Sequence, residues 1–315
     1  MAIRLTPLTL NDRHRFEQAV SSMANGRTTA LSTWAFAPHY VWKDQFSFAW
    51  TEIEGWWCLF AEYVDGLYMP LPPLGPGSAS GNALGFDAVV SQVMEFMRSK
   101  NFGSSVTRIE NVPSELAASF EGMGYTVRTK DAEYLYRRED IAKLEGDRYK
   151  SPRHAYNRFL QNGRIRYEPY GTGDRVECRE LFHRWSGQKE KQYAGACRDG
   201  FGIERFMLQD AESAHRIIME CSESLDLTGR VVRVHGAMCA YTFGFRRSSD
   251  VFCVLVEVTD RTIVGASHYV FREFCRELEP YTFINTMDDS GLPSLARSKQ
   301  AYAPVERVQN YIVTP

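Results

Sequence analysis

Hydrophobic and polar positions along the chain predict two halves with the same order of elements. In the first half the pattern predicts two hairpin strands, a helix, a strand, a second helix and a strand pair, at residues 56–64, 67–74, 84–100, 105–110, 114–122 and 125–138. In the second half it predicts three antiparallel strands, a helix, a strand, a short helix and a final strand, at residues 231–235, 237–246, 251–258, 264–278, 281–285, 293–301 and 307–313. The repeat is one of element order, without a residue-by-residue repeat.

This order of elements predicts the fold class. Hairpins precede the crossover helices in both halves, which is not the order of a doubly wound nucleotide-binding fold. We therefore expect an α/β (α+β) protein with mixed, largely antiparallel sheets in two tandem domains. The expected division is an N-terminal domain at 1–140, a basic linker helix at 141–163 and a C-terminal domain at 164–315, which would carry the site.

The linker region concentrates positive charge. Residues 148–166 contain six Lys or Arg and no Asp or Glu, whereas the whole chain has a net charge of −2, so the remainder stands at −8. If Ser151 caps a helix, Arg153 and Asn157 share one face and Arg158 lies on the adjacent stripe. Such a stripe can bind phosphate groups. The alternative is a solvated linker helix.

Composition narrows the class of protein. The 315 residues are 44% hydrophobic and 24% charged, which is ordinary for a folded globular chain. The longest apolar runs are far shorter than the roughly 20 residues of a membrane helix, and the first residues lack the apolar stretch of a secretory signal. Seven dispersed cysteines predict reduced thiols rather than a disulfide framework or a zinc site. We expect a cytoplasmic protein.

Several common catalytic motifs are absent from the sequence. It has no phosphate-binding Gly-x-x-x-x-Gly-Lys loop, no Gly-x-Gly-x-x-Gly turn, no Gly-x-Ser-x-Gly elbow and no His-Glu-x-x-His helix. The seven histidines form no pair with metal-ligand spacing, and we interpret His183 and His215 as packing or surface residues. No metal site is predicted.

The junction between strand 251–258 and the following helix carries candidate chemistry. Small residues at a helix start let backbone N–H groups approach an anion or an acyl carbonyl. This junction resembles the acyl-donor loop of GNAT-type acyltransferases, because Arg261, Gly265 and Ala266 fit that pattern, although Val264 replaces its first glycine. Glu257, near the end of the strand, is a candidate general base, with a structural carboxylate as the alternative.

The C-terminal segment carries the most specific resemblance. It contains Asn285, an acidic turn ending at Gly291, a Lys-x-x-Tyr-x-Pro motif from Lys299 through Tyr302 to Pro304, and a late Tyr311. This order resembles the phosphatidylglycerol lysyltransferase C-terminal-domain family, as do the basic segment at 148–160 and the aromatic-dense region at 31–60. The resemblance therefore spans nearly the whole chain.

The resemblance implies two tandem GNAT-like (acyl-CoA N-acyltransferase-like) domains, related to Fem-type aminoacyl-tRNA-dependent transferases. In such relatives a late lysine lies near the tRNA end or the reacting carbonyl, and Lys299 is the matching position here; the alternative is a surface lysine. Unlike the lysyltransferase, this sequence has no transmembrane portion to deliver a lipid. A peripheral lipid contact stays open.

The leading hypothesis is an acyl- or aminoacyltransferase with an aminoacyl-tRNA donor and an open choice of acceptor. Glu257 or Asp288 would deprotonate the acceptor, and backbone N–H groups at Gly265 and Ala266 would hold the carbonyl. Lys299 and Arg153 would bind the donor's phosphates. The full set of expected donor-binding residues is Arg153, Asn157, Arg158, Arg261, Gly265, Ala266 and Tyr302.

Two alternatives accompany this hypothesis. One is an acetyl-CoA-dependent GNAT N-acetyltransferase, which the valine at position 264 disfavours. The other is a non-catalytic protein of the same fold that binds RNA or another phosphate-bearing partner through the basic segment.

Overall fold

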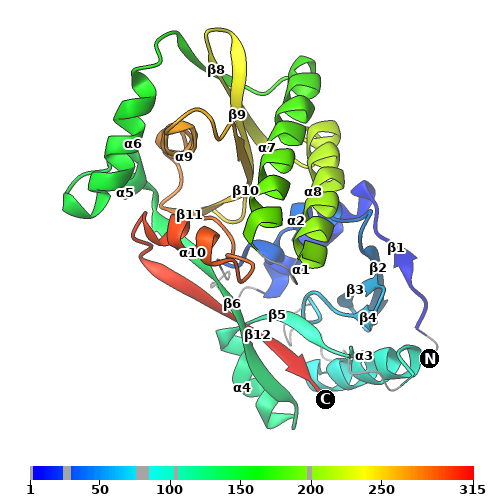
Figure 1. The fold of residues 1–315 in the computed structure, drawn as a ribbon. Helices are drawn as coiled ribbons and strands as arrows, with labels where there is room; N and C mark the ends of the chain where they lie inside the picture. The colour runs from blue at the N-terminus through cyan, green and yellow to red at the C-terminus, as the bar shows by residue number, and fades with distance from the viewer. Residues whose placement is uncertain (1–2, 24–29, 76–84, 103–105, 197–200) are drawn as a thin grey trace. The chain divides into compact units, whose positions relative to one another are not determined.

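A computed structural model of the chain describes residues 3–23, 30–75, 85–102, 106–196 and 201–315, with backbone only in 191–196 and 201–210 (Figure 1). The chain divides by its contacts into two compact units. Unit 1 comprises Met1–Glu133 with Val308–Pro315, and unit 2 comprises Tyr134–Arg307. The domain ranges given above remain a prediction from the sequence.

Unit 1 contains a four-stranded antiparallel sheet in the order β1-β2-β3-β4. Its elements are β1 (Thr6–Pro7), α1 (Arg13–Met23), α2 (Phe36–Val41), β2 (Ser47–Ile53), β3 (Trp56–Tyr63), β4 (Gly66–Tyr68), α3 (Phe86–Lys100), β5 (Ile109–Pro113) and α4 (Ser114–Gly122). The end of β12 (Glu306–Thr314) pairs antiparallel with β5. Apolar residues of α3, β3 and β5 form one core with Val313, so the last residues of the chain are needed to complete unit 1.

Unit 2 contains the strands β6-β11-β10-β9-β8-β7, in that order, which are part of an eight-stranded sheet. Its strands are the second half of β6 (Thr126–Arg137), β7 (Ile165–Pro169), β8 (Thr228–Val234), β9 (Ala237–Arg246), β10 (Val251–Thr259) and β11 (Phe283–Asn285). All neighbours pair antiparallel except β10 and β11, which are parallel. This is the mixed sheet that the sequence predicts.

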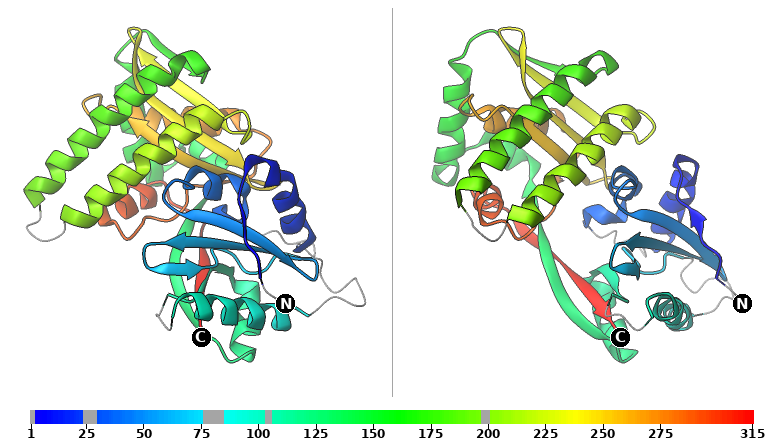
Figure 2. Two further views of the ribbon diagram at one scale, coloured as in Figure 1. Left: turned by 90° about the vertical axis from the view of Figure 1, so that its right-hand side faces the viewer. Right: turned by 45° about the vertical axis from the view of Figure 1, so that its right-hand side comes forward.

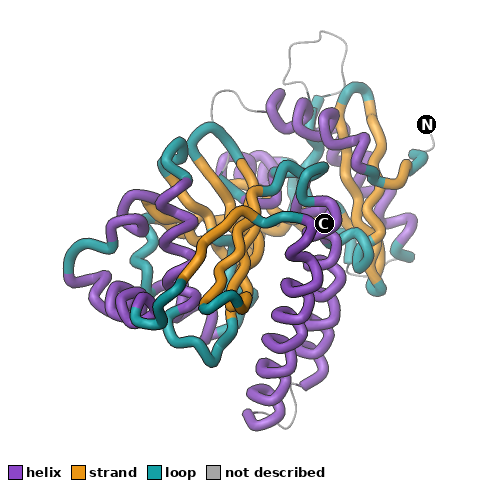
Figure 3. The backbone as a smooth tube through the Cα atoms, turned by 90° about the horizontal axis from the view of Figure 1, so that it is seen from above, coloured by secondary structure: helices purple, strands orange, loops and turns teal. Residues whose placement is uncertain are grey.

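The α-helices in the described part of unit 2 are α5 (Arg138–Lys143), α6 (Lys150–Leu160), α7 (Arg175–Ala196), α8 (Phe201–Cys221), α9 (Ala266–Glu277) and α10 (Pro293–Gln300). The helices α7 and α8 lie on one face of the sheet and α6 and α9 on the other (Figure 2). Seen from above, α7 and α8 run side by side as a pair (Figure 3). The apolar sides of α6 and α9 bury Tyr156, Phe159 and Val270 against β8 and β9.

Two elements differ clearly from the sequence prediction. The strand expected at 67–74 is limited to β4, Gly66–Tyr68, and the strand pair expected at 125–138 also differs. The strand pair expected at 125–138 is a single strand, β6, whose first half is mostly exposed and whose residues Ala132–Tyr136 are buried. A strand pair would need a turn within this range, and the polar stretch around Lys130 and Asp131 lies in its middle. The strand continues through it because its first half belongs to unit 1 and its buried second half to unit 2, where Leu135 pairs with Asn285.

Candidate functional site

The pairing between β10 and β11 in the sheet of unit 2 stops partway along β10. The two strands pair over only three positions, the last joining Cys253 to Asn285, and β11 ends there while β10 continues to Thr259. Within β10 the pairing with β9 also shifts between Val254 and Val256. The second half of β10 thus has a strand neighbour on the β9 side only, which leaves its side chains next to α9 and the segment after β11.

Glu257 lies in this half of β10, opposite Thr242 of β9. Glu257 as a whole residue is partly exposed to solvent. Its carboxyl group is shielded from water, and this burial raises the pKa of the carboxyl group from 4.5 to about 8. Burial, and after it the charge of Glu257, raises the pKa of both Cys275 and Tyr302. The carboxyl group therefore lies on the side of the sheet covered by α9.

Tyr302 brings α10 and α9 together beside Glu257. Its ring centroid lies 4.9 Å from that of Phe271 and 5.8 Å from that of His268, and 6.5 Å from that of Tyr136. Burial raises the pKa of the Tyr302 phenol well above 10 and lowers that of His268 below 6.5. Both rings are therefore neutral near pH 7. Sequence reasoning missed His268, although its position directly after the loop that resembles a GNAT acyl-donor loop was an available signal.

The N-terminus of α9 presents backbone N–H donors, but they are not the expected pair at Gly265 and Ala266. Gly265 precedes the helix with φ of 85°, and a Cβ atom there would collide with the carbonyl oxygen of Ala155 in α6. The N–H of Ala266 donates to Ile263 O at 3.3 Å. Within the described part of the chain, the N–H groups of Gly265, Ser267 and His268 have no acceptor. The first turn of α9 can therefore hold an anion or a carbonyl oxygen.

Lys299 holds the turn that follows β11. Its ammonium group donates to the carbonyl oxygens of Thr286, Met287 and Asp288, at 3.2 Å for Met287. Its own carbonyl oxygen accepts a hydrogen bond of 2.9 Å from the hydroxyl of Tyr136. An ammonium group has three donors, and three carbonyls face them here. Lys299 thus connects α10 to the turn at Thr286–Asp288 and to Tyr136 of β6.

The two neighbouring aspartates of this turn have different contacts. Asp288 accepts a hydrogen bond of 2.8 Å from the N–H of Ser290. Asp289 is 8% exposed and accepts one of 2.6 Å from the Tyr134 hydroxyl. The sequence singled out Asp288, but Asp289 is the more buried of the two, and it anchors the turn to β6.

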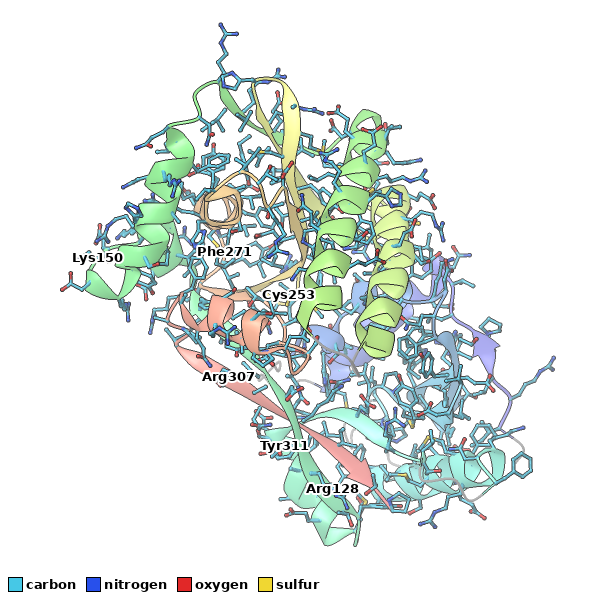
Figure 4. All side chains as sticks on the ribbon, viewed as in Figure 1. Arg128, Lys150, Cys253, Phe271, Arg307 and Tyr311 are labelled. Carbon is cyan, nitrogen blue, oxygen red and sulfur yellow. The ribbon has the colours of Figure 1, made fainter. Side chains whose placement is uncertain are left out.

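The basic helix α6 packs through one face and exposes the other. Tyr156 and Phe159 are buried, and the Tyr156 hydroxyl donates to Glu273 of α9 at 2.8 Å. Arg153 donates to the carbonyls of Leu144 and Gly146, at 3.0 Å for Gly146, and so fixes the chain before the helix. Asn157 and Arg158 are exposed, and Lys150 lies at the outer end of α6 in Figure 4.

Among the predicted site residues, the structure brings Glu257 and Tyr302 together, with Lys299 linked to them through Tyr136. Arg261 is exposed in the loop before α9. Burial, and after it the charge of Arg261, lowers the pKa of Lys189 on α7. Lys189 is therefore a second cation beside this loop, which sequence reasoning missed because the two residues are far apart in the chain.

Comparison with known proteins gives the relatives of the chain. The model of the family described as phosphatidylglycerol lysyltransferase, C-terminal, matches residues 29–314. A conserved protein of unknown function from Bacteroides thetaiotaomicron is 24% identical, with a TM-score of 0.81 and 99% of each chain covered. L-PGS from Bacillus licheniformis is 15% identical, with a TM-score of 0.62 over 96% of this chain and 91% of that one. The comparison with curated proteins gave no match.

Two further solved structures bear on the fold. FemX is 10% identical, with a TM-score of 0.57 over 98% of this chain and 97% of that one. A tandem GNAT protein from the clavulanic acid biosynthesis pathway is 12% identical, with a TM-score of 0.53 over 99% and 98%. These matches confirm the tandem GNAT-like α/β fold. In the part of the chain that the structure describes, no helix has both the length and the hydropathy needed to cross a bilayer.

Proposed function

Because the chain belongs to the family of phosphatidylglycerol lysyltransferase C-terminal domains, we propose that it is an aminoacyltransferase that takes its aminoacyl group from a charged tRNA. Family and fold support an acyl- or aminoacyltransferase; the tRNA donor is the further step. The observation that carries the proposal is the position of Glu257. Its carboxyl group lies in the half of β10 without a β11 partner, and its charge acts on Tyr302, whose ring centroid lies 5.8 Å from that of His268 in the first turn of α9.

The proposed chemistry is transfer from an ester. An acceptor amine or hydroxyl attacks the aminoacyl carbonyl while the Glu257 carboxylate takes the acceptor's proton. Charge then develops on the carbonyl oxygen, and the N–H groups of Gly265, Ser267 and His268 stabilise it. The bond between the carbonyl carbon and the terminal ribose oxygen of the tRNA then breaks, and that oxygen takes the proton that Glu257 removed from the acceptor. Tyr302, which stays protonated, donates a hydrogen bond to the leaving oxygen.

Lys299 has a different part in this proposal from the one that the sequence suggested. Three backbone carbonyls face its ammonium group, so its charge is directed to the turn at Thr286–Asp288. We assign it to positioning that turn beside Glu257 and Tyr302. The exposed Arg158 and Arg261 remain candidates for the donor's phosphates, because a long polyanion needs contacts on an open surface.

The test uses the full chain with tRNA carrying radiolabelled amino acids and an extract that supplies amine, hydroxyl and lipid acceptors. We expect transfer of label by the wild type and its loss in Glu257→Gln. The control is Glu180→Gln, which removes an exposed carboxylate on α7 and should retain full activity.

Other results point to the alternatives. Transfer of acetyl groups from acetyl-CoA, together with a rise in melting temperature on adding it, replaces the tRNA donor with a conventional acetyltransferase. If charged and uncharged tRNA bind with the same salt-sensitive affinity and no label is transferred to any acceptor, the chain is a non-catalytic RNA-binding protein. Either outcome overturns the proposal.

A further inference from the structure

A cavity of about 280 Å³ lies between α7 and α8, away from Glu257 and α9. From α7 it is lined by Arg179, Phe182 and His183. From α8 it is lined by Glu212, Ser213, His215, Arg216 and Met219. All of these residues belong to unit 2. The transferase chemistry proposed above uses none of them.

His215 is the buried polar residue of this cavity. It is 7% exposed, and its Nδ1 lies 2.9 Å from the hydroxyl oxygen of Tyr241, which is itself fully buried. Burial lowers the pKa of His215 to about 3, so the ring is neutral. The Tyr241 hydroxyl has no other partner among the described residues, so its proton goes to Nδ1.

This hydrogen bond fixes the tautomer of His215. With Nδ1 as the acceptor, the ring proton is on Nε2, which becomes a donor. Within the described part of the chain, Nε2 has no acceptor. His215 lines the cavity, so an oxygen of a ligand there can accept the hydrogen bond of this N–H group.

The charged residues around the cavity limit the charge of such a ligand. The guanidinium group of Arg216 donates a hydrogen bond of 2.8 Å to the carboxylate of Glu220. The Nε2 atom of His183 lies 3.7 Å from the Oε1 atom of Glu212. Arg179 has no ion pair or hydrogen bond among the described residues. One guanidinium group is therefore available, while two carboxylates lie nearby. This balance favours a singly charged anion over a phosphate.

The apolar residues that line the cavity favour a ligand with an apolar part. Phe182 packs on His215, with ring centroids 4.7 Å apart, and Met219 lines the α8 side. Arg179 and Phe182 are three residues apart on α7, so they share one face of that helix.

We propose that the cavity between α7 and α8 binds a small organic monocarboxylate with an apolar body. The carboxylate accepts hydrogen bonds from the Arg179 guanidinium and from Nε2–H of His215, and the apolar part lies against Phe182 and Met219. A guanidinium fork matches the two oxygens of a carboxylate.

The test is a titration of the full chain with fluorobenzoate, followed by fluorine NMR and by the ring nitrogen signals of ¹⁵N-labelled histidine. We expect saturable binding and a shift of the His215 Nε2 signal. Arg179→Ala should weaken binding about tenfold or more, the loss expected for one charge-assisted hydrogen bond. Arg184→Ala, an exposed arginine of α7 outside the cavity, should bind as the wild type does.

Three results would overturn this assignment. They are no binding of fluorobenzoate to the wild type, equal affinity in Arg179→Ala, and inorganic phosphate displacing fluorobenzoate at lower concentration. Both arginine variants change exposed side chains, and circular dichroism checks that each is folded. His215→Gln gives a second measurement, because an amide N–H in place of Nε2–H should retain part of the affinity.

Discussion

Replacing Glu257 by glutamine should stabilise the protein at high pH while removing its activity. The side chain of glutamine has nearly the same shape as that of glutamate but carries no charge at any pH. The side chain lies in a region where ionisation is unfavourable, since burial raises its pKa from 4.5 to about 8. The wild type therefore loses stability when this group ionises, and the variant does not.

The sign and size of the effect follow from proton linkage. Below pH 4.5 the carboxyl group is protonated in both folded and unfolded chains, so it adds no pH dependence. Between pH 4.5 and about 8 only the unfolded chain releases the proton, so stability falls as pH rises. Above about 8 the loss levels off. A rise from 4.5 to about 8 corresponds to about 5 kcal/mol, an upper limit because Glu257 keeps some contact with water.

The assay is urea denaturation followed by circular dichroism, at several pH values across this range, for the wild type, Glu257→Gln and Glu180→Gln. The free energy of unfolding of Glu257→Gln, relative to the wild type, should grow with pH and then level off above about 8. That of Glu180→Gln should stay parallel to the wild type. A difference between Glu257→Gln and the wild type that does not change with pH would refute a buried, ionisable Glu257.

Three further changes test the packing around the site and the structure of unit 2. Lys299→Met removes the donors to the turn after β11, so the free energy of unfolding should fall by about 1–3 kcal/mol and amide exchange at Met287 should accelerate; unchanged exchange would contradict the anchoring role. Gly265→Ala places a methyl group against Ala155 O at positive φ and should cost about 2 kcal/mol or more in urea denaturation. Gly236→Ala, at φ of 89° with open space around it, is the matched control and should cost about 1 kcal/mol; equal costs would reject the close packing of α6 on α9. Arg233→Ala leaves the carboxylates of its ion pairs beside β8 without their cation and should cost about 3 kcal/mol, whereas a loss within experimental error would show that this cluster does not stabilise unit 2.

Much of unit 2 was predictable because its elements carry clear periodic patterns. The expected strands at 237–246 and 251–258 correspond to β9 and β10, and the expected helix at 264–278 to α9. The continuity of β6 was not predictable, since a polar stretch within a strand resembles a turn when its neighbours in space are unknown. The partners of β12 are likewise a matter of long-range pairing.

The candidate site shows where sequence reasoning stops. Glu257 was found from its place at the end of a strand, but its raised pKa depends on burial under α9. Lys299 was found from a family motif, yet its three carbonyl partners come from a turn that only the folded chain brings to it. Asp288 and Asp289 cannot be told apart in sequence, because burial beside Tyr134 distinguishes them.

The central claim is that Glu257 acts as the base in aminoacyl transfer. The most direct measurement is the rate of label transfer from charged tRNA across pH 6 to 9, for the wild type and Glu257→Gln. The account predicts a wild-type rate that rises with pH and levels off above about 8, because only the ionised carboxylate accepts a proton, and a variant without this rise. Equal rates and equal pH profiles in the two proteins would contradict it.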